Sequence, residues 1–229
     1  MKPLTLLAML AIAAQAQVVS PKFHDQQRQI HAVLILPAAV DMHFVGMKGG
    51  RGLPEASDKV GEWLYTDISA ELAARGATVL PDPLPAAATD EAKYALSDLQ
   101  RKFDSVSVQL FKKPHALEKG RYTLGDGVSD YAPAASADTL VFIRGSGSES
   151  SPNKQAFDWA MLRPFPNTFS ARIAFVDAHT GEVLALATVE SLRDVIKKSP
   201  EALRSSVCKA FHDLPLPGKT AAPAAGKHD

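Results

Sequence analysis

Two short, continuously apolar runs restrict the fold of this chain more than any other feature. Residues 31–37 read HAVLILP and residues 138–143 read DTLVFI, and neither run alternates between apolar and polar side chains. A strand that faces water on one side alternates, whereas a strand buried on both faces reads as an unbroken apolar run. Both runs are therefore predicted to be strands of a sheet that other elements cover on each side.

The covering elements are predicted to be helices, because three longer segments place apolar residues at helical spacing. These segments are residues 54–75, 90–111 and 191–212. Ser57 and Thr89 are candidate N-caps of the first two helices, since a hydroxyl group can accept a hydrogen bond from an unpaired N–H group of the first turn.

Shorter segments complete the order of elements. We expect a brief strand over residues 77–80, a short helix within residues 122–137, and two paired strands over residues 171–176 and 183–189. This order predicts an α/β fold in which helices pack on a mixed, mostly parallel sheet that ends in an antiparallel hairpin.

The N-terminal sequence MKPLTLLAMLAIAAQAQ has the pattern of a secretory signal peptide. Lys2 precedes an apolar run that is shorter than the ~20 residues of a membrane-spanning helix, and Ala14, Gln15 and Ala16 form a small-x-small cleavage pattern. No cysteine follows the run as a lipid-attachment site. We therefore expect residues 1–16 to be removed and the mature chain to be periplasmic or secreted, with no membrane span and no lipid anchor.

The remainder is predicted to form one domain. We expect a polar lead-in over residues 17–30, a single α/β domain over residues 31–213, and a disordered tail over residues 214–229, which are rich in proline and alanine. Without the leader the chain has 24 basic and 25 acidic residues, so nucleic acid is not an expected partner. The single cysteine, Cys208, excludes an internal disulfide and is predicted to be buried in the last helix.

Residues 175–184, FVDAHTGEVL, collect several reactive side-chain types in one place. Asp177 can accept hydrogen bonds from the N–H groups two and three residues further on, and Gly181 suits a position of positive φ. The segment is therefore predicted to be a hairpin turn, with His179 and Glu182 pointing to solvent. An active site is the weaker interpretation, because the other ligands that zinc would need are not found nearby.

Residues 41–52 are rich in glycine, residues 145–153 are rich in glycine and serine, and both are predicted to be surface loops. The stretch GSGSES lacks the lysine of a phosphate-binding loop and the G-x-S-x-G order of a nucleophile elbow. No cofactor is predicted from either segment.

Three functional hypotheses remain open on the residues alone. Asp41 and His43 are candidate metal ligands without an assigned third ligand, and together with Asp126 they form the basis of a rival hypothesis, a metal- or carboxylate-dependent hydrolase. A third hypothesis is a small-ligand pocket between helices and sheet. The favoured hypothesis is non-catalytic protein binding, with a contact surface made by the side chains of Trp159, Phe165, Lys48 and Arg51.

Four stretches together resemble a family of bacterial envelope proteins. They read HAVLILPAA, VGEWLYTDISAELAARG followed by ATVLP, LGDGVSDYAPAASADTLVFIRGSG, and ARIAFVDAHTGEVLALATV. The family includes the curli-secretion channel lipoproteins and the lipoprotein activators of peptidoglycan synthases. The resemblance implies a non-enzymatic envelope domain that binds another protein or assembles with its own copies. Residues 46–53 are too short for a pore-forming hairpin, whose strands need ~9–11 residues each, so a pore is not expected.

Overall fold

The two apolar runs lie side by side at the centre of the sheet. The structure is a computed structural model that describes residues 17–25, 30–81, 89–128, 130, 131, 134, 136–161, 168–191 and 200–216. In it β2 (Ala32–Ile35) pairs in parallel with the first part of β6 (Thr139–Ser150). Val33 and Leu34 are both buried but belong to different apolar clusters, one on each face. The prediction of a strand covered on both faces is confirmed.

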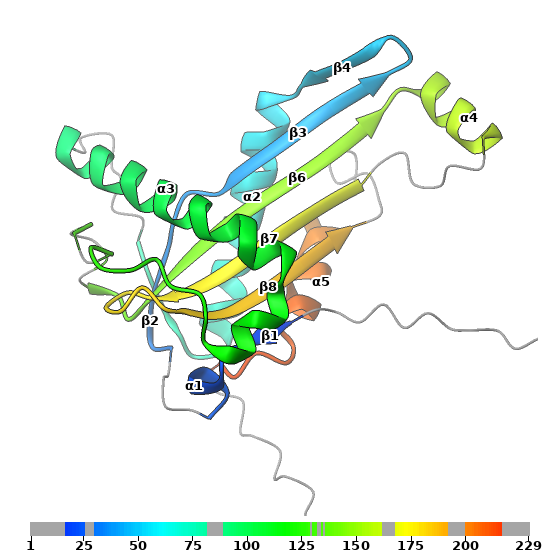
Figure 1. The fold of residues 1–229 in the computed structure, drawn as a ribbon. Coiled ribbons are helices and arrows are strands. Elements are labelled where there is room, and N and C mark those ends of the chain that lie inside the picture. The colour runs from blue at the N-terminus through cyan, green and yellow to red at the C-terminus, as the bar shows by residue number, and fades with distance from the viewer. Residues whose placement is uncertain are drawn as a thin grey trace, which may run out of the picture.

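The described strands form one mixed sheet of eight, in the order β1-β8-β7-β6-β2-β5, with β3 beside the second part of β6 and β4 outside β3 (Figure 1). The remaining strands are β1 (Val18–Val19), β3 (Ala39–Gly46), β4 (Gly49–Gly52), β5 (Thr78–Leu80), β7 (Thr168–Asp177) and β8 (Val183–Ser191). Helices on a mixed sheet with an antiparallel hairpin are confirmed. Fewer of the strand pairs are parallel than predicted. Antiparallel pairing joins β1 to β8, β8 to β7, β7 to β6, and β3 to β4.

Helices cover the sheet on both faces, with α3 and η1 in front and α2 and α5 behind in the view of Figure 1. The helices are α1 (Pro21–His24), α2 (Pro54–Ala74), α3 (Asp90–Lys112), η1 (Pro114–Lys119), α4 (Pro152–Ala160) and α5 (Pro200–Phe211). The predicted helices over residues 54–75 and 90–111 are confirmed as α2 and α3. Of the third predicted helix, residues 200–211 form α5 and residues 192–199 lie outside the described residues. The short helix expected within residues 122–137 falls partly outside them.

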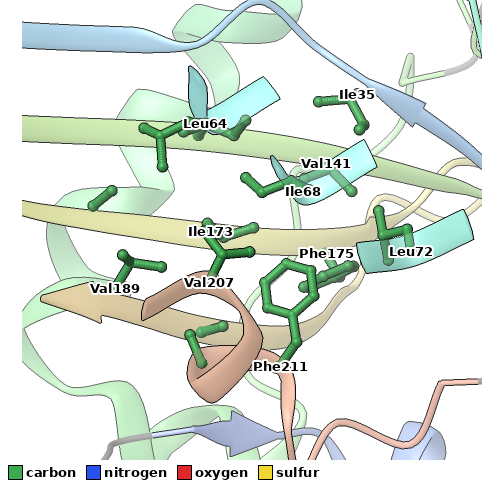
Figure 2. Packing of buried hydrophobic residues seen from close by; sticks show 14 of the residues in the cluster. Ile35, Leu64, Ile68, Leu72, Val141, Ile173, Phe175, Val189, Val207 and Phe211 are labelled. Carbon is green, nitrogen blue, oxygen red and sulfur yellow. The ribbon is translucent and has the colours of Figure 1, made fainter. Parts of the chain in front are cut away.

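The core behind the sheet is mainly aliphatic, and Figure 2 labels two of its aromatic residues, Phe175 and Phe211. Ile68 of α2 and Val207 of α5 pack against the strands, and the rings of Phe175 and Phe211 meet edge to face with centroids 5.6 Å apart. Burying one such side chain stabilises the fold by about 1.5–3 kcal/mol. The α2 and α5 helices are therefore fixed to the sheet chiefly by apolar packing.

The core in front of the sheet is organised around Phe103 of α3. Its ring stacks on the ring of Phe142 in β6, with centroids 4.2 Å apart, and the guanidinium carbon of Arg144 lies 5.2 Å from the Phe103 centroid. At the start of α3, the Thr89 hydroxyl accepts a hydrogen bond from the N–H group of Ala92, as predicted. Ser57 does not cap α2: its hydroxyl accepts from the N–H group of Met42, and Leu53 is the N-cap.

The two predicted glycine-rich loops are mainly strands, and that prediction is wrong. Residues 41–52 form most of the β3–β4 hairpin, and residues 145–150 are the second part of β6, which pairs in parallel with β3. The pairing joins backbone groups some hundred residues apart, so local composition does not reveal it. Glycine is favoured at position 147, since a Cβ atom there would lie 2.9 Å from the backbone carbonyl oxygen of Thr168 and 2.7 Å from the sulfur of Met42.

The ends of the described domain extend beyond the predicted limits of 31 and 213. Within the expected lead-in, Val18 pairs opposite Leu186 of β8 and Phe23 is fully buried. Within the expected tail, Leu214 and Leu216 are buried in the core behind the sheet. These apolar residues are too sparse to form a periodic pattern, so the segments look polar in sequence. The predicted leader, residues 1–16, and residues 217–229 lie outside the described residues.

Candidate functional site

The β3–β4 hairpin and α4 lie next to one another at one end of the sheet, which we call the distal end (Figure 1). The hairpin turns at Met47 and Lys48, and α4 begins directly after β6 ends. The N–H group of Ser151 donates to the carbonyl oxygen of Val45 at 3.0 Å. This hydrogen bond joins the start of α4 to β3, so the two parts form one surface.

The α4 helix is stabilised by its own polar contacts. Ser151 caps it, because its hydroxyl accepts from the N–H group of Lys154 at 3.2 Å. The Lys154 ammonium group in turn donates to the carboxylate of Asp158 at 2.6 Å. Asp158 is buried, whereas Trp159 next to it is 70 % exposed. The helix thus turns its ion pair inward and its tryptophan outward.

Exposed apolar side chains are concentrated at the distal end. Six large apolar residues are exposed within the described part of the chain, and four of them, Met47, Phe157, Trp159 and Met161, are on the hairpin or on α4 and its C-cap. The other two, Tyr94 and Val108, are on α3. Large apolar side chains that are exposed in one region of a protein are a feature of many contact sites.

Two basic side chains accompany this apolar surface. The guanidinium carbon of Arg51 lies 5.6 Å from the ring centroid of Phe44, and Lys48 lies at the hairpin turn. Between the hairpin and the start of α4 is an open hollow of about 480 Å³, lined in part by Phe44, Met47, Lys48 and Arg51. The structure therefore brings three of the predicted binding residues, Trp159, Lys48 and Arg51, to one end. Phe165 lies outside the described residues.

The candidate metal ligands Asp41 and His43 project from β3 and pair with each other. His43 Nε2 lies 2.9 Å from a carboxylate oxygen of Asp41, and both side chains are largely exposed. His43 lines an open hollow of about 450 Å³. The other lining residues are Ser146, Gly147, Ser148, Thr168, Phe169, Ser170 and Glu190.

The described residues contain no group of three or more histidine, cysteine, aspartate or glutamate side chains able to hold a metal ion. Asp126, the third residue of the hydrolase hypothesis, lies in the segment next to α3, where its carbonyl oxygen accepts from Lys102 at 3.2 Å. The structure therefore supplies no third ligand to the pair of Asp41 and His43 within its described part.

The segment FVDAHTGEVL forms the predicted turn between β7 and β8. Asp177 accepts hydrogen bonds from the N–H groups of His179 at 2.9 Å and Thr180 at 2.7 Å, and Gly181 has φ +69°. His179 is exposed, as predicted, but Glu182 does not point to solvent. Its carboxylate pairs with Lys22 at 2.7 Å and is 13 % exposed, because the N-terminal segment packs over this turn.

The prediction that Cys208 is buried is wrong, because its position on α5 faces outward, next to α2. The Cys208 thiol donates to the carboxylate of Glu71 at 3.0 Å, and Arg75 donates to the same carboxylate at 2.7 Å. The hydrogen bond to Glu71, with some burial, raises the pKa of Cys208. Burial opposes ionisation of Glu71, but the bonds from Cys208 and Arg75 outweigh it and lower the pKa of Glu71.

One turn earlier on α2, the pKa of Asp67 is shifted in the opposite direction to that of Glu71. Burial raises the pKa of Asp67, an effect that Arg204 of α5 opposes and Glu201 strengthens. Sequence reasoning missed this ionisable interface between α2 and α5. Its only signal was the spacing of Asp67, Glu71 and Arg75 at intervals of four, which places them on one side of the helix.

Comparison with known proteins gives structural likeness only. No model of a known protein family matches this chain, and no curated protein matches it in sequence. The chain is similar to a PelC dodecamer subunit from Paraburkholderia phytofirmans, with 11 % identity over 88 % of this chain and 96 % of that one and a TM-score of 0.39. It is also similar to lipoprotein GNA1162 from Neisseria meningitidis, with 13 % identity over 80 % of this chain and 96 % of that one and a TM-score of 0.35. These values assign the chain to no family.

Among the described residues, none forms a helix that is both long and apolar enough to cross a membrane.

Proposed function

We propose that this chain is a secreted, non-catalytic protein of the bacterial cell envelope that acts by binding another protein through its distal end. The bound protein is a different envelope protein or a further copy of this chain. The observation that carries the proposal is the concentration of exposed apolar side chains at the distal end, namely Met47, Phe157, Trp159 and Met161. The leader pattern of residues 1–16 supports the compartment.

The composition of this surface is that of a protein interface. Tryptophan, methionine, phenylalanine and arginine are enriched where proteins meet, and a few such anchors supply most of the binding free energy. Removing one central anchor from an interface typically costs about 2–4 kcal/mol. Trp159 is the strongest candidate, because it has the largest exposed ring at this end.

The α4 helix at the distal end is also stabilised by polar contacts in the unbound protein. The hydrogen bond from Ser151 to Val45 joins the start of α4 to β3, and the ion pair of Lys154 with Asp158 stabilises the helix itself. A contact surface that is already ordered loses less conformational entropy on binding, which favours affinity. The distal end therefore combines exposed anchors with a rigid support.

The test is cross-linking in the native envelope followed by recovery of the tagged full-length chain. Trp159→Ala and Met161→Ala should each reduce the yield of a discrete cross-linked partner by at least tenfold. Tyr94→Ala is the matched control, because Tyr94 is an equally exposed aromatic residue on α3. Unchanged yields for the α4 variants, or equal losses for Tyr94→Ala, would overturn the proposal.

A further inference from the structure

The outer strand of the distal hairpin has an open edge. Within the described residues, β4 pairs with β3 and with no other strand. Three of its four residues, Gly49, Gly50 and Gly52, have no side chain to shield the backbone. Proteins usually protect such an edge, since its unpaired N–H and C=O groups bind other extended chains.

The orientation of the free backbone groups follows from the ladder. The N–H group of Leu53 donates to the carbonyl oxygen of Met42 at 2.7 Å, so residue 53 faces β3. Successive residues of an antiparallel pair face alternately toward and away from the neighbouring strand. Arg51 and Gly49 therefore turn their backbone groups to β3, whereas Gly50 and Gly52 turn theirs to the open edge.

We propose that β4 binds an extended, acidic segment of the partner protein as an additional strand of the sheet. This inference rests on the proposed function and specifies how the distal end makes contact. The backbone groups of Gly50 and Gly52 supply the hydrogen bonds, and the neighbouring hollow of about 480 Å³ accepts alternate side chains of the added strand.

The space along β4 permits this approach. A Cβ atom built on Gly49 or on Gly52 would meet nothing within 4 Å. These two positions are therefore open on the face of β4. Since β4 pairs only with β3 among the described strands, an added strand can lie at the interstrand distance of about 4.8 Å that backbone pairing needs. Phe44 and Met47 provide apolar contact in the hollow next to the strand.

Charge selects an acidic segment. Lys48 and Arg51 are the charged residues of the stretch FVGMKGGRGL, residues 44–53. Arg51 also lines a smaller hollow with Glu55 and Glu149, so Lys48 is the less compensated charge. Symmetric pairing of two β4 strands would bring these like charges together, which is unfavourable. An acidic segment of a different protein therefore pairs with β4 more favourably than the β4 strand of a second copy does.

The probe is a short, end-capped peptide that alternates glutamate with valine, and its control alternates lysine with valine. With the full-length chain, the glutamate peptide should slow amide hydrogen exchange at Gly50 and Gly52 by at least tenfold at saturation. The lysine peptide should bind at least tenfold more weakly. Equal binding of the two peptides, or protection elsewhere but not on β4, would overturn the inference.

Two variants at one position isolate the backbone contribution. Gly52→Pro removes an outward N–H group and should weaken binding of the glutamate peptide about three- to tenfold. Gly52→Ala keeps that group and should bind as the unmodified chain does. Equal affinities for the two variants would contradict strand addition.

The experiments distinguish a failure of strand addition at β4 from a failure of the proposed function. If Trp159→Ala abolishes partner cross-linking while Gly52→Pro does not, the distal end is a contact surface and strand addition is refuted. If neither substitution affects cross-linking, both proposals are refuted.

Discussion

Lys154 and Asp158 form an ion pair within α4, with the ammonium nitrogen 2.6 Å from a carboxylate oxygen. The pair is turned toward the body of the protein, since the Asp158 side chain is 9 % exposed and that of Lys154 is 23 % exposed. Trp159, one residue further, is consequently held on the outer side. The pair stabilises the helix that carries the proposed anchor.

Replacing Asp158 by alanine should loosen α4. The variant leaves the poorly solvated Lys154 ammonium group without its partner, at a cost of about 1–3 kcal/mol. Amide exchange within α4 should accelerate about tenfold or more. Asp90→Ala breaks a comparable but exposed pair with Lys93 in α3 and should cost less than about 1 kcal/mol. Equal effects at the two sites would contradict a supporting role for Asp158.

Glu71→Gln should lower the free energy of unfolding at neutral pH by about 1–2 kcal/mol, because the amide loses charge-assisted hydrogen bonds. The pKa of Glu71 is held below its ordinary value of 4.5 by Cys208 and Arg75 against the effect of burial. Its stabilisation is therefore present above pH 4.5 and is lost as the pH falls through the folded-state pKa. Urea unfolding at several pH values should show the two proteins converging in acid. A constant difference would contradict this assignment.

Asp67→Asn should have the opposite pH dependence. Burial raises the pKa of Asp67 above 3.8, so the folded state holds the proton more tightly than the unfolded chain. The charged form therefore costs stability above the folded-state pKa, and that cost disappears as the pH falls toward 3.8. The variant should gain most stability relative to the natural chain at neutral pH. A loss of stability at neutral pH would show that attraction to Arg204 outweighs burial.

The turn between β7 and β8 should depend on Gly181 more than on a neighbouring glycine. Gly125→Ala imposes an unfavourable positive φ, which costs about 1–2 kcal/mol, but meets nothing within 4 Å. Gly181→Ala imposes a similar φ and also places its Cβ atom 2.6 Å from the carbonyl oxygen of Gly125. The clash should add about 1–3 kcal/mol. Equilibrium unfolding of both variants measures the difference, and equal losses would contradict it.

The central fold was predictable because its signals are local. The unbroken runs of β2 and β6 predicted strands buried on both faces, Thr89 marked the start of α3, and Asp177 with Gly181 predicted the turn. Each of these residues acts on neighbours a few positions away, so the chemistry of one short stretch is sufficient.

The distal end was not predictable to the same degree, because its structure depends on distant pairing. Ser146 and Ser148 lie in a strand because the second part of β6 pairs with β3 on one side and with β7 on the other. Lys48, Arg51 and Trp159 were predicted to be binding residues from their residue types, but the sequence could not show that the hairpin and α4 meet. The burial of Cys208 was predicted wrongly, because its position, next to the buried Val207 on α5, lies just outside the buried side of the helix.

The most direct test of the distal end as a protein-binding surface is site-specific photo-cross-linking in intact cells. A photoreactive amino acid is placed at Trp159 in one variant and at Tyr94 in another, since both positions are highly exposed. We expect a discrete protein adduct from position 159 and none from position 94. The same adducts from both positions, or no adduct from position 159, would contradict a binding function for the distal end.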